Sequence, residues 1–214
     1  MLEHKRVLIT TGPTWVPIDD VRVMSNTATG ETGIFLAEEA RRRRAVVTLL
    51  VGPSLRGFKL SGVVVKEFRF FDDLERSLRL QLRKTRYDIV IQAAAVSDFR
   101  PARMNKGKIH SGQKRLRLDL VPTPKLIDTI KRLQPDTVLV GFKFEPKTHK
   151  NLLFKEAQDL ICRSRADCVL ANTRFGNRYL AYLVTKNGLI SKPVVSKKMA
   201  AKKIIRFCER CLEQ

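Results

Sequence analysis

Two glycine-bearing segments near the start of the chain contain residue types suited to binding phosphate. Gly12 lies in segment 10–14, directly after an apolar run, and segment 25–33 leads into a helical pattern. Backbone N–H groups at a helix start, together with the helix dipole, favour bound anions. Ordinary helix capping by Thr27 or Thr29 would explain the same residue types. These segments alone therefore leave both interpretations open.

Two further candidate groups follow later in the chain. Asp98 comes shortly after three alanines (93–95) at the end of an apolar run, where small residues let a ligand approach the backbone. It could equally cap a turn. Lys108 lies in a basic, turn-rich segment, 105–112, suited to closing over a triphosphate as a mobile positive charge. Taken alone, such a segment is more often a solvated loop.

Other kinds of site have less support. The fingerprint GxGxxG is absent and no acidic residue ends the second apolar run, which argues against an NAD-type oxidoreductase. The three histidines are dispersed, so neither a catalytic dyad with cysteine nor a metal cluster is indicated. Cys208 and Cys211 have CxxC spacing without a second pair or a nearby histidine, which favours a helix face over a zinc site. We expect no metal held by protein ligands.

The elements that must position these residues alternate between strand and helix. Short apolar runs predict strands at 7–10, 46–51, 63–65, 89–95, 138–142 and 168–171. Helical spacing predicts helices from about 30 to the arginine cluster at 41–44, and at 71–83, 126–133, 152–163 and about 198–212. This alternation predicts an α/β fold with a doubly wound, Rossmann-like, mostly parallel sheet.

Two regions interrupt this alternation. Polar, turn-rich sequence predicts a flexible active-site loop at about 99–115, and alternating leucines predict a half-exposed strand at 116–120. Segments 179–185 and 189–195 flank an Asn-Gly turn, which indicates an antiparallel hairpin at about 179–195. No internal repeat and no long linker is present, so we expect a single domain over 1–214.

The composition indicates a folded and strongly basic chain. An apolar share of 43% in 214 residues is sufficient for a core. The sequence shows neither a run of about 18 apolar residues nor a secretory signal, which predicts a cytoplasmic chain with reduced cysteines and no membrane partner. The net charge of +21 attracts anions. Nucleic acid bound without sequence preference is one alternative, although the basic runs lack interleaved aromatic residues.

The order of these segments resembles the phosphopantothenoylcysteine synthetase family. The similarity begins with Thr10-Thr11-Gly12-Pro13-Thr14, Pro17-Ile18-Asp19, Val21-Arg22 and Ser25-Asn26 before Gly30. It continues with Ala93-Ala94-Ala95-Val96-Ser97-Asp98-Phe99-Arg100-Pro101, Lys108-Ile109, Pro124, Gly141-Phe142 with Glu145, and Ala171-Asn172. The match covers nearly the whole chain, from about Val7 to Val184, and is far more specific jointly than in any one part.

The resemblance implies a ligase of coenzyme A biosynthesis. A nucleoside triphosphate, CTP in bacterial members and ATP in animal ones, activates the carboxylate of 4'-phosphopantothenate as an acyl-nucleotide, which the amine of cysteine then attacks. The enzyme positions the substrates and neutralises charge. Mg²⁺ bound through phosphate oxygens completes the neutralisation. A homodimer with the later hairpin near its interface is also implied.

The resemblance also implies roles for individual residues. Asn26 would hold the pantothenate part of the acyl intermediate and Lys108 would balance the triphosphate charge, which makes both candidate catalytic residues. The candidate nucleotide-binding residues are Gly12, Ala93, Ala94, Ala95, Asp98, Lys108, Pro124 and Phe142. The candidate substrate-binding residues are Asn26, Thr29, Gly30, Gly33 and Asn172, with Gly30 and Gly33 admitting the substrate phosphate.

The chain departs from the family pattern around this phosphate. Ala28-Thr29-Gly30-Glu31 stands where members commonly carry Ser-Ser-Gly and a basic residue. The change removes a hydroxyl group and adds a carboxylate, so phosphate affinity is weaker or basic residues elsewhere compensate. A diverged relative with weak activity therefore stays open.

Other departures concern the nucleotide and the domain composition. Two lysines of CTP-using bacterial members fall near Leu160 and Ser164, with Arg163 and Arg165 as neighbours only, which leaves CTP and ATP both open. His110 stands where many bacterial members carry a lysine. Most bacterial relatives are fused to a flavin-dependent decarboxylase for which this length leaves no room, so we expect another chain to perform the decarboxylation.

Overall fold

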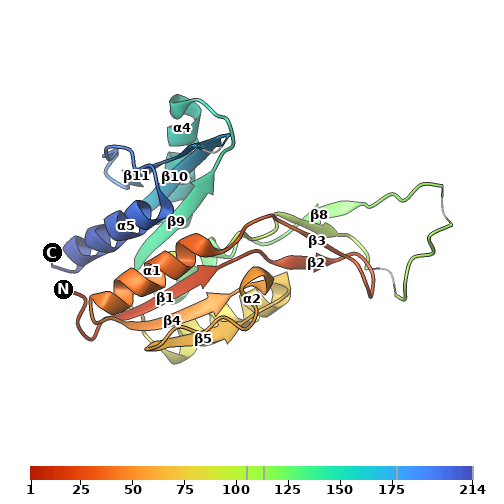
Figure 1. Cartoon of the computed structure of the whole chain (residues 1–214), viewed down its shortest axis with the longest axis horizontal. Helices are drawn as coiled ribbons and strands as arrows, with labels where there is room; N and C mark the ends of the chain where they lie inside the picture. The colour runs from red at the N-terminus through yellow and green to blue at the C-terminus, as the bar shows by residue number, and fades with distance from the viewer. Residues whose placement is uncertain (105, 113, 177, 214) are drawn as a thin grey trace.

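The central element of the fold is a mostly parallel sheet. The computed structural model describes residues 1–104, 106–112, 114–176 and 178–213. Within these ranges, seven strands form a sheet in the order β11-β10-β9-β6-β1-β4-β5, parallel except for β11 (Figure 1). Its strands are β1 Arg6–Thr11, β4 Val46–Val51, β5 Val63–Glu67, β6 Ile89–Gln92, β9 Val138–Phe144, β10 Cys168–Phe175 and β11 Arg178–Thr185. The predicted α/β fold class is confirmed.

Helices cover both faces of the sheet because successive strand residues point to opposite sides and both sets are apolar. In β1, Val7 and Ile9 join a core cluster with α1 and α5, whereas Leu8 joins a cluster with α2, α3 and α4. The helices are α1 Glu31–Arg42, α2 Phe71–Lys84, α3 Ile127–Leu133, α4 Lys150–Ser164 and α5 Lys197–Leu212, with a 3-10 helix at Pro53–Leu55. The predicted α-helices agree with these bounds to within two residues.

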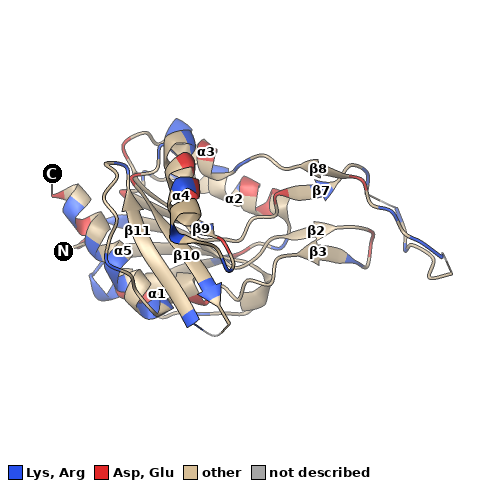
Figure 2. Cartoon of the chain, turned by 90° about the horizontal axis from the view of Figure 1, so that it is seen from above, with Lys and Arg blue, Asp and Glu red and all other residues tan. Residues whose placement is uncertain are grey.

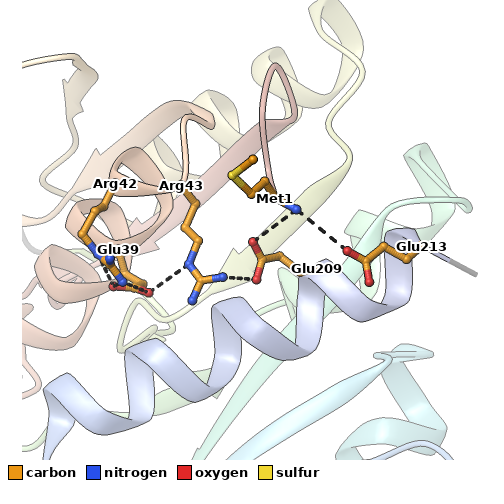
Figure 3. A network of polar contacts seen from close by, with 6 residues as sticks. All are labelled: Met1, Glu39, Arg42, Arg43, Glu209 and Glu213. Carbon is orange, nitrogen blue, oxygen red and sulfur yellow. Dashed lines mark hydrogen bonds and ion pairs between the residues drawn. The ribbon is translucent and has the colours of Figure 1, made fainter.

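An ion-pair network joins the end of α1 to α5 (Figure 3). Glu39 accepts hydrogen bonds from Arg42 (Nη2 to Oε1, 2.8 Å) and Arg43 (Nε to Oε1, 3.2 Å), and Arg43 also pairs with Glu209 of α5. The amino group of Met1 lies 3.7 Å from Oε1 of Glu209. The hydrogen bond to Glu209 raises the pKa of Arg43, so the guanidinium stays charged. The network fixes how α1 packs on α5.

Two short antiparallel arms extend from the sheet, and the sequence analysis predicted neither. β2 Trp15–Pro17 pairs with β3 Val23–Ser25, and β7 Phe99–Pro101 pairs with β8 Leu120–Pro122 (Figure 2). The predicted strand at 116–120 is wrong, because residues 116–119 form no strand and pairing begins only at Leu120. A segment of alternating leucines forms a strand only where a neighbouring strand supplies hydrogen bonds, and β7 pairs through only three residues. β7 itself occupies the start of the predicted flexible loop.

β11, the first strand of the C-terminal hairpin predicted at about 179–195, lies at one edge of the sheet. β11 pairs antiparallel with β10 along its whole length, and β10 extends four residues beyond the predicted strand. The predicted turn at Gly188 is present, since its N–H donates to the carbonyl of Thr185 (3.0 Å). Segment 189–195 forms two isolated bridges, Ile190 with Val184 and Val194 with Ala181, rather than a continuous strand. Pro193 lacks an N–H group and so interrupts a regular ladder there.

Two of the cysteines lie on α5. Cys208 is buried on α5 and Cys211 is half-buried on the same helix. Burial raises the pKa of the Cys208 thiol, as expected for a core side chain. In the part of the chain that the structure describes, no helix has the length and apolar character needed to cross a membrane.

Candidate active site

The first group of candidate residues lies where the connections of the sheet change direction. β1 lies between β4 and β6, and the chain passes from β1 to β4 on one side but from β6 to β9 on the other. Ligands of open α/β sheets bind outside the carboxyl ends of the strands at such a point. Gly12 follows β1, and the three alanines at 93–95 follow β6. These candidate residues therefore lie at the carboxyl ends of β1 and β6, and their contact with a ligand stays a prediction.

Backbone hydrogen bonds join these two segments beyond the ends of their strands. The N–H of Ala95 donates to the carbonyl of Gly12 (2.9 Å), and the N–H of Thr14 donates to the carbonyl of Ala95 (3.2 Å). Gly12 has a φ of 82°, and a Cβ there would lie 3.0 Å from the backbone nitrogen of Gly52. Glycine is needed for this conformation and close approach. β6 itself ends at Gln92, three residues before the predicted end.

Asn26 is anchored at the same place. Its Nδ2 atom donates a hydrogen bond to the carbonyl of Ala95 (3.0 Å), which also accepts from Thr14. The preceding residue, Ser25, donates from Oγ to the carbonyl of Thr14 (3.3 Å). The Asn26 side chain is nevertheless exposed. The structure thus brings Asn26, Gly12 and Ala95 together and leaves the amide accessible to a ligand.

Helix α1 begins at Glu31, and its N-cap residue, Gly30, lies beside these residues. Gly30 has a φ of 77°, its carbonyl accepts a hydrogen bond from Oγ1 of Thr11 (2.7 Å), and a Cβ there would lie 3.2 Å from Cα of Gly12. The capping that Thr29 supplies is weak, because its Oγ1 accepts from the N–H of Glu31 at 3.4 Å. The start of α1 therefore retains backbone N–H groups that could bind an anion.

The carboxylate of Glu31 has a basic partner. Nζ of Lys197, the first residue of α5, lies 2.7 Å from Oε2 of Glu31. Both side chains are partly exposed, so the pair is a modest source of stability. Its electrostatic consequence is local: the ammonium group offsets the negative charge that the sequence analysis noted at the helix start. Whether this ion pair preserves phosphate affinity stays a prediction.

Gly33 lies in the contact between α1 and β1. It is buried, and a Cβ at this position would lie 2.2 Å from both Cβ and Oγ1 of Thr11. Helix packing therefore accounts for the absence of a side chain. The contact of Gly33 with a substrate phosphate stays a prediction.

Asp98 and Pro124 are neighbours although 26 residues separate them in the sequence. The N–H of Thr123 donates to the carbonyl of Asp98 (2.9 Å), and Nζ of Lys125 lies 2.6 Å from Oδ1 of Asp98. Both charged side chains are exposed. The two candidate nucleotide-binding residues thus share one surface, with a lysine that the sequence analysis did not single out.

Three buried hydroxyl residues support this surface. Oγ1 of Thr14 accepts from the N–H of Ser97 (2.9 Å), and Oγ1 of Thr123 donates to the carbonyl of Ser97 (2.5 Å). They connect the segment after β1 to the segment after β6 and to the segment that follows β8. Thr14 and Ser97 lie within the motifs that carry the resemblance, but nothing in the sequence distinguishes a supporting hydroxyl from a solvated one.

Phe142 and Asn172 lie on neighbouring strands farther along the same edge. Phe142 of β9 pairs with Leu170 of β10, and Asn172 pairs with Phe144. Phe142 is partly buried against the core cluster that includes α1 and α5, while the carbonyl of Asn172 accepts from the N–H of Glu145 (3.0 Å). No contact within the described ranges joins either residue to Asn26.

Lys108 does not lie at the switch point, the place between β1 and β6 where the connections of the sheet change direction. Its neighbours Gly107 and Ile109 are hydrogen-bonded to the turn between β2 and β3. Asn26 follows β3 at the opposite end of that hairpin, about 13 Å away along the strand at roughly 3.3 Å per residue. The Lys108 side chain is exposed. The structure therefore separates the two candidate catalytic residues by the length of one arm.

Two cavities lie away from all the candidate residues. One, of about 420 Å³, is lined by Lys131, Pro135, Gln158, Ile161, Cys162, Arg165, Ala166, Asp167 and Lys186. The other, of about 440 Å³, is lined by Thr148, His149, Lys150, Asn151, Leu153, Thr173, Phe175, Leu180 and Tyr182. None of the candidate residues lines either cavity.

Comparison with known families gives the same assignment as the motifs. A family model described as the DNA/pantothenate metabolism flavoprotein C-terminal domain matches residues 2–211. The chain belongs to this family. Among its relatives is the coenzyme A biosynthesis bifunctional protein CoaBC of Thermococcus kodakarensis, 42% identical over 173 residues, which cover 80% of this chain and 42% of the relative. The chain spans about half the length of the curated relatives it matches.

Two solved structures have the same architecture as this chain. The C-terminal domain of a CoaBC protein aligns with a TM-score of 0.81 at 26% identity, over 99% of this chain and 97% of that chain. A Cab2 variant in complex with phosphopantothenate-cysteine aligns with a TM-score of 0.79 over 98% and 88% of the two chains. At 19% identity the latter shows the fold alone. The predicted family resemblance is confirmed.

The donor set of the described residues does not suit a protein-bound metal. Within the described ranges, His, Cys, Asp and Glu side chains form no group of three or more that could hold a metal ion. Mg²⁺ would have to arrive on the phosphate oxygens of a nucleotide, which is a common way of binding this ion. The backbone N–H groups at the start of α1 stay candidates for binding phosphate.

Proposed function

We propose that this chain is a phosphopantothenate–cysteine ligase of coenzyme A biosynthesis. The observation that carries the proposal is the junction of Asn26, Ala95 and Gly12 at the switch point of the sheet, beside the start of α1. This junction offers an oriented amide, backbone groups and a helix N-terminus within one surface. Membership of a family that includes CoaBC proteins supports the reaction assigned to it.

The reaction has two steps. A carboxylate oxygen of 4'-phosphopantothenate attacks the α-phosphorus of a nucleoside triphosphate, and pyrophosphate leaves. The amine of cysteine then attacks the acyl carbon, loses a proton, and displaces the nucleoside monophosphate to form the amide. The first step brings two polyanions together and the second requires an oriented attack by a neutral amine, so charge neutralisation and positioning supply most of the catalysis.

The proposed roles of the individual residues follow from the family resemblance. Asn26 orients the acyl group for attack by the amine, while Thr29, Gly30 and Gly33 receive the substrate phosphate at the start of α1. Asp98 and Pro124 contact the base or ribose from their shared surface, and Gly12, Ala93, Ala94 and Ala95 contact the nucleotide at the ends of β1 and β6. Phe142 and Asn172 extend the site along β9 and β10, and Lys108 neutralises the triphosphate.

The identity of the nucleotide is part of the proposal, and we propose CTP or ATP. By the family resemblance, two lysines of CTP-using members fall near Leu160 and Ser164, and Ser164 is buried with its hydroxyl donating to the carbonyl of Leu160 (2.6 Å). The neighbouring Arg163 pairs with Asp128 (3.3 Å). Neither Leu160 nor Ser164 can replace the positively charged ammonium group of a lysine. The side chains that would favour CTP in bacterial relatives are thus missing, which keeps ATP as an equal candidate.

We also propose a homodimer that acts in the cytoplasm. The proposal of a dimer rests on the family resemblance and places the C-terminal hairpin near the interface. The cytoplasm is where nucleoside triphosphates and reduced thiols are abundant. Sedimentation analysis tests the oligomeric state directly, and a monomer at all concentrations would contradict the proposal.

The decisive assay compares the two nucleotides. Purified protein with Mg²⁺, cysteine and 4'-phosphopantothenate should release pyrophosphate from CTP or from ATP, and omission of 4'-phosphopantothenate should abolish the release. The comparison tests the activity and identifies the nucleotide together. If a correctly folded sample releases pyrophosphate with neither nucleotide, the ligase assignment is wrong.

A further inference from the structure

The turn between β2 and β3 contains a buried carboxylate with two separate tasks. Asp19 is only 3% exposed. Its Oδ1 atom accepts hydrogen bonds from the backbone N–H groups of Val21 (2.9 Å) and Arg22 (2.7 Å), which shapes the turn itself. Its Oδ2 atom accepts from the N–H of Ile109 (3.0 Å) and pairs with the guanidinium of Arg22. One oxygen therefore builds the turn and the other holds a distant segment.

The segment held by Oδ2 carries Lys108. Nη1 of Arg22 also donates to the carbonyl of Ile109 (3.2 Å), so Asp19 and Arg22 together bind both the N–H and the carbonyl of one residue. On the other side of Lys108, the N–H of Gly107 donates to Oδ2 of Asp20 (2.9 Å). The backbone is thus held on both sides of Lys108, while the lysine side chain is exposed.

We call these contacts of Asp19, Asp20 and Arg22 with Gly107 and Ile109 the clamp. The charge of Asp19 strengthens it. Burial opposes the charge of Asp19, but hydrogen bonds from Ile109, Val21 and Arg22 lower its pKa from 3.8 to about 2. The carboxylate therefore stays ionised throughout the physiological range. Charge-assisted hydrogen bonds are stronger than neutral ones, and the guanidinium of Arg22 holds the carboxylate in a fixed orientation.

The clamp also relates Lys108 to the switch point. β3 connects the Asp19 turn at one end to Asn26 at the other, so a single hairpin determines the separation of the two candidate catalytic residues. A lysine on an unrestrained segment would have to lose conformational freedom each time it met a phosphate group. Ordering the backbone in advance reduces that loss.

We propose that Asp19, with Arg22 as its partner, is a positioning residue that holds the backbone at Lys108 so that the ammonium group is presented to the phosphates of the nucleotide. The inference rests on the proposed function for its effect on the reaction. The clamp itself makes a prediction about the loop that is independent of any activity.

Asp19→Asn is the informative variant because it separates the two tasks. The amide oxygen can still accept from Val21 and Arg22 in the turn, whereas the amide nitrogen cannot accept from Ile109 and repels Arg22. Asp20→Asn is the control matched in charge: Asp20 holds only Gly107, and a rotated amide can keep that bond. Arg22→Lys is a second variant, since one ammonium group cannot reproduce the planar fork that meets both partners.

The rate of limited trypsin digestion after Lys108 measures how firmly the clamp holds the backbone. The bond after Lys108 contains the N–H group that Asp19 holds, whereas the bonds after Lys114 and Arg115 lie outside the clamp. In Asp19→Asn we expect cleavage after Lys108 to accelerate about tenfold or more, which corresponds to a loss of roughly 1.4 kcal/mol of local protection. Cleavage after Lys114 and Arg115 should change little, and Asp20→Asn should resemble the wild type. Equal cleavage after Lys108 in Asp19→Asn and wild type overturns the clamp.

A double-mutant cycle reads the effect on the reaction. Asp19→Asn should slow acyl-nucleotide formation about tenfold in a quenched single turnover, and should have little further effect when Lys108→Gln is already present. If Asp19 has a purely structural role, Asp19→Asn should slow the reaction equally in the wild type and in Lys108→Gln, and this result would overturn the positioning role. Faster cleavage after Lys108 with an unchanged rate of acyl-nucleotide formation would also overturn it. If the wild type forms no acyl-nucleotide with either CTP or ATP, the ligase proposal fails, while the cleavage pattern still decides whether the clamp exists. If Asp19→Asn does not fold, Arg22→Lys provides the same two measurements.

Discussion

The side-chain amide of Asn26 is held by one hydrogen bond, from Nδ2 to the carbonyl of Ala95 (3.0 Å). Asn26→Asp replaces this donor with a carboxylate oxygen that faces a carbonyl oxygen, so the side chain must turn away. We expect acyl-nucleotide to form and its consumption by cysteine to slow about tenfold to a hundredfold, as for the loss of an oriented hydrogen bond worth roughly 1–3 kcal/mol. Quenched-flow analysis of both half-reactions measures this. Unchanged product formation would show that Asn26 does not orient the acyl group.

Lys108 is expected to act on the other half-reaction. Lys108→Gln keeps most of the side-chain length and removes the positive charge that would meet the triphosphate. Acyl-nucleotide formation should fall at least about a hundredfold, in the range seen when a charge-stabilising donor is removed. The measurement is the single-turnover yield of acyl-nucleotide, with thermal stability as the control. A normal yield would exclude a role for this ammonium group in the first step.

At the scale of elements, the contact between α1 and β1 depends on a glycine. A Cβ at Gly33 would lie 2.2 Å from Cβ and Oγ1 of Thr11, and Thr11 Oγ1 also bonds the carbonyl of Gly30 at the helix start. Gly33→Ala should lower the free energy of unfolding by about 1–3 kcal/mol because α1 must shift. Gly112→Ala is the control, since a Cβ there meets nothing within 4 Å. Urea denaturation of the two variants decides, and equal stability would contradict the close packing.

The pairing of α1 with α5 depends on Arg43. Its side chain is 19% exposed and lies between the carboxylates of Glu39 and Glu209, which are 6% and 10% exposed (Figure 3). Arg43→Ala would leave two mostly buried carboxylates without this partner, so we expect a loss of about 3 kcal/mol in the free energy of unfolding. Arg86→Ala, at a surface pair with Asp136, should cost less than about 1 kcal/mol. Similar losses in the two variants would show that the network is not important for stability.

At the scale of the whole molecule, the charge of +21 makes the fold sensitive to acid. Protonation of the 21 acidic residues would leave 42 lysines and arginines to repel one another. Although burial opposes the charge of Asp167, hydrogen bonds from Lys186, Leu139 and Lys131 lower its pKa, and the pKa of Asp19 is lowered to about 2. Because these folded-state pKa values lie below those of the unfolded chain, their stabilisation is present above about pH 4 and is lost as the pH falls toward about 2.

The corresponding measurement is the free energy of unfolding as a function of pH at low and high salt. We expect little change between neutral pH and about pH 5, a fall between about pH 4 and pH 2, and a smaller fall in high salt because screening weakens the repulsion. Stability that rises on acidification, or an acid-induced loss that salt does not reduce, would contradict this electrostatic account.

The sequence alone was sufficient for the fold class and for the family. Strands buried on both faces are continuous apolar runs, and α1, α2 and α5 have clear apolar faces, so local pattern and final structure agree. The family motifs likewise singled out Gly12, Asn26 and the three alanines as candidates, because these residues lie in short segments that can be recognised from residue type alone.

Only the tertiary structure decided how these segments meet. Asn26 bonds a carbonyl 69 residues later, Asp19 binds an N–H group 90 residues later, and Glu31 meets a lysine 166 residues later. The β2–β3 and β7–β8 arms were missed for the same reason, since three-residue strands have no periodicity to recognise. Hydrogen bonds and ion pairs of this kind depend on distances of about 3 Å between groups that the chain brings together only on folding, and no local pattern of residue types records them.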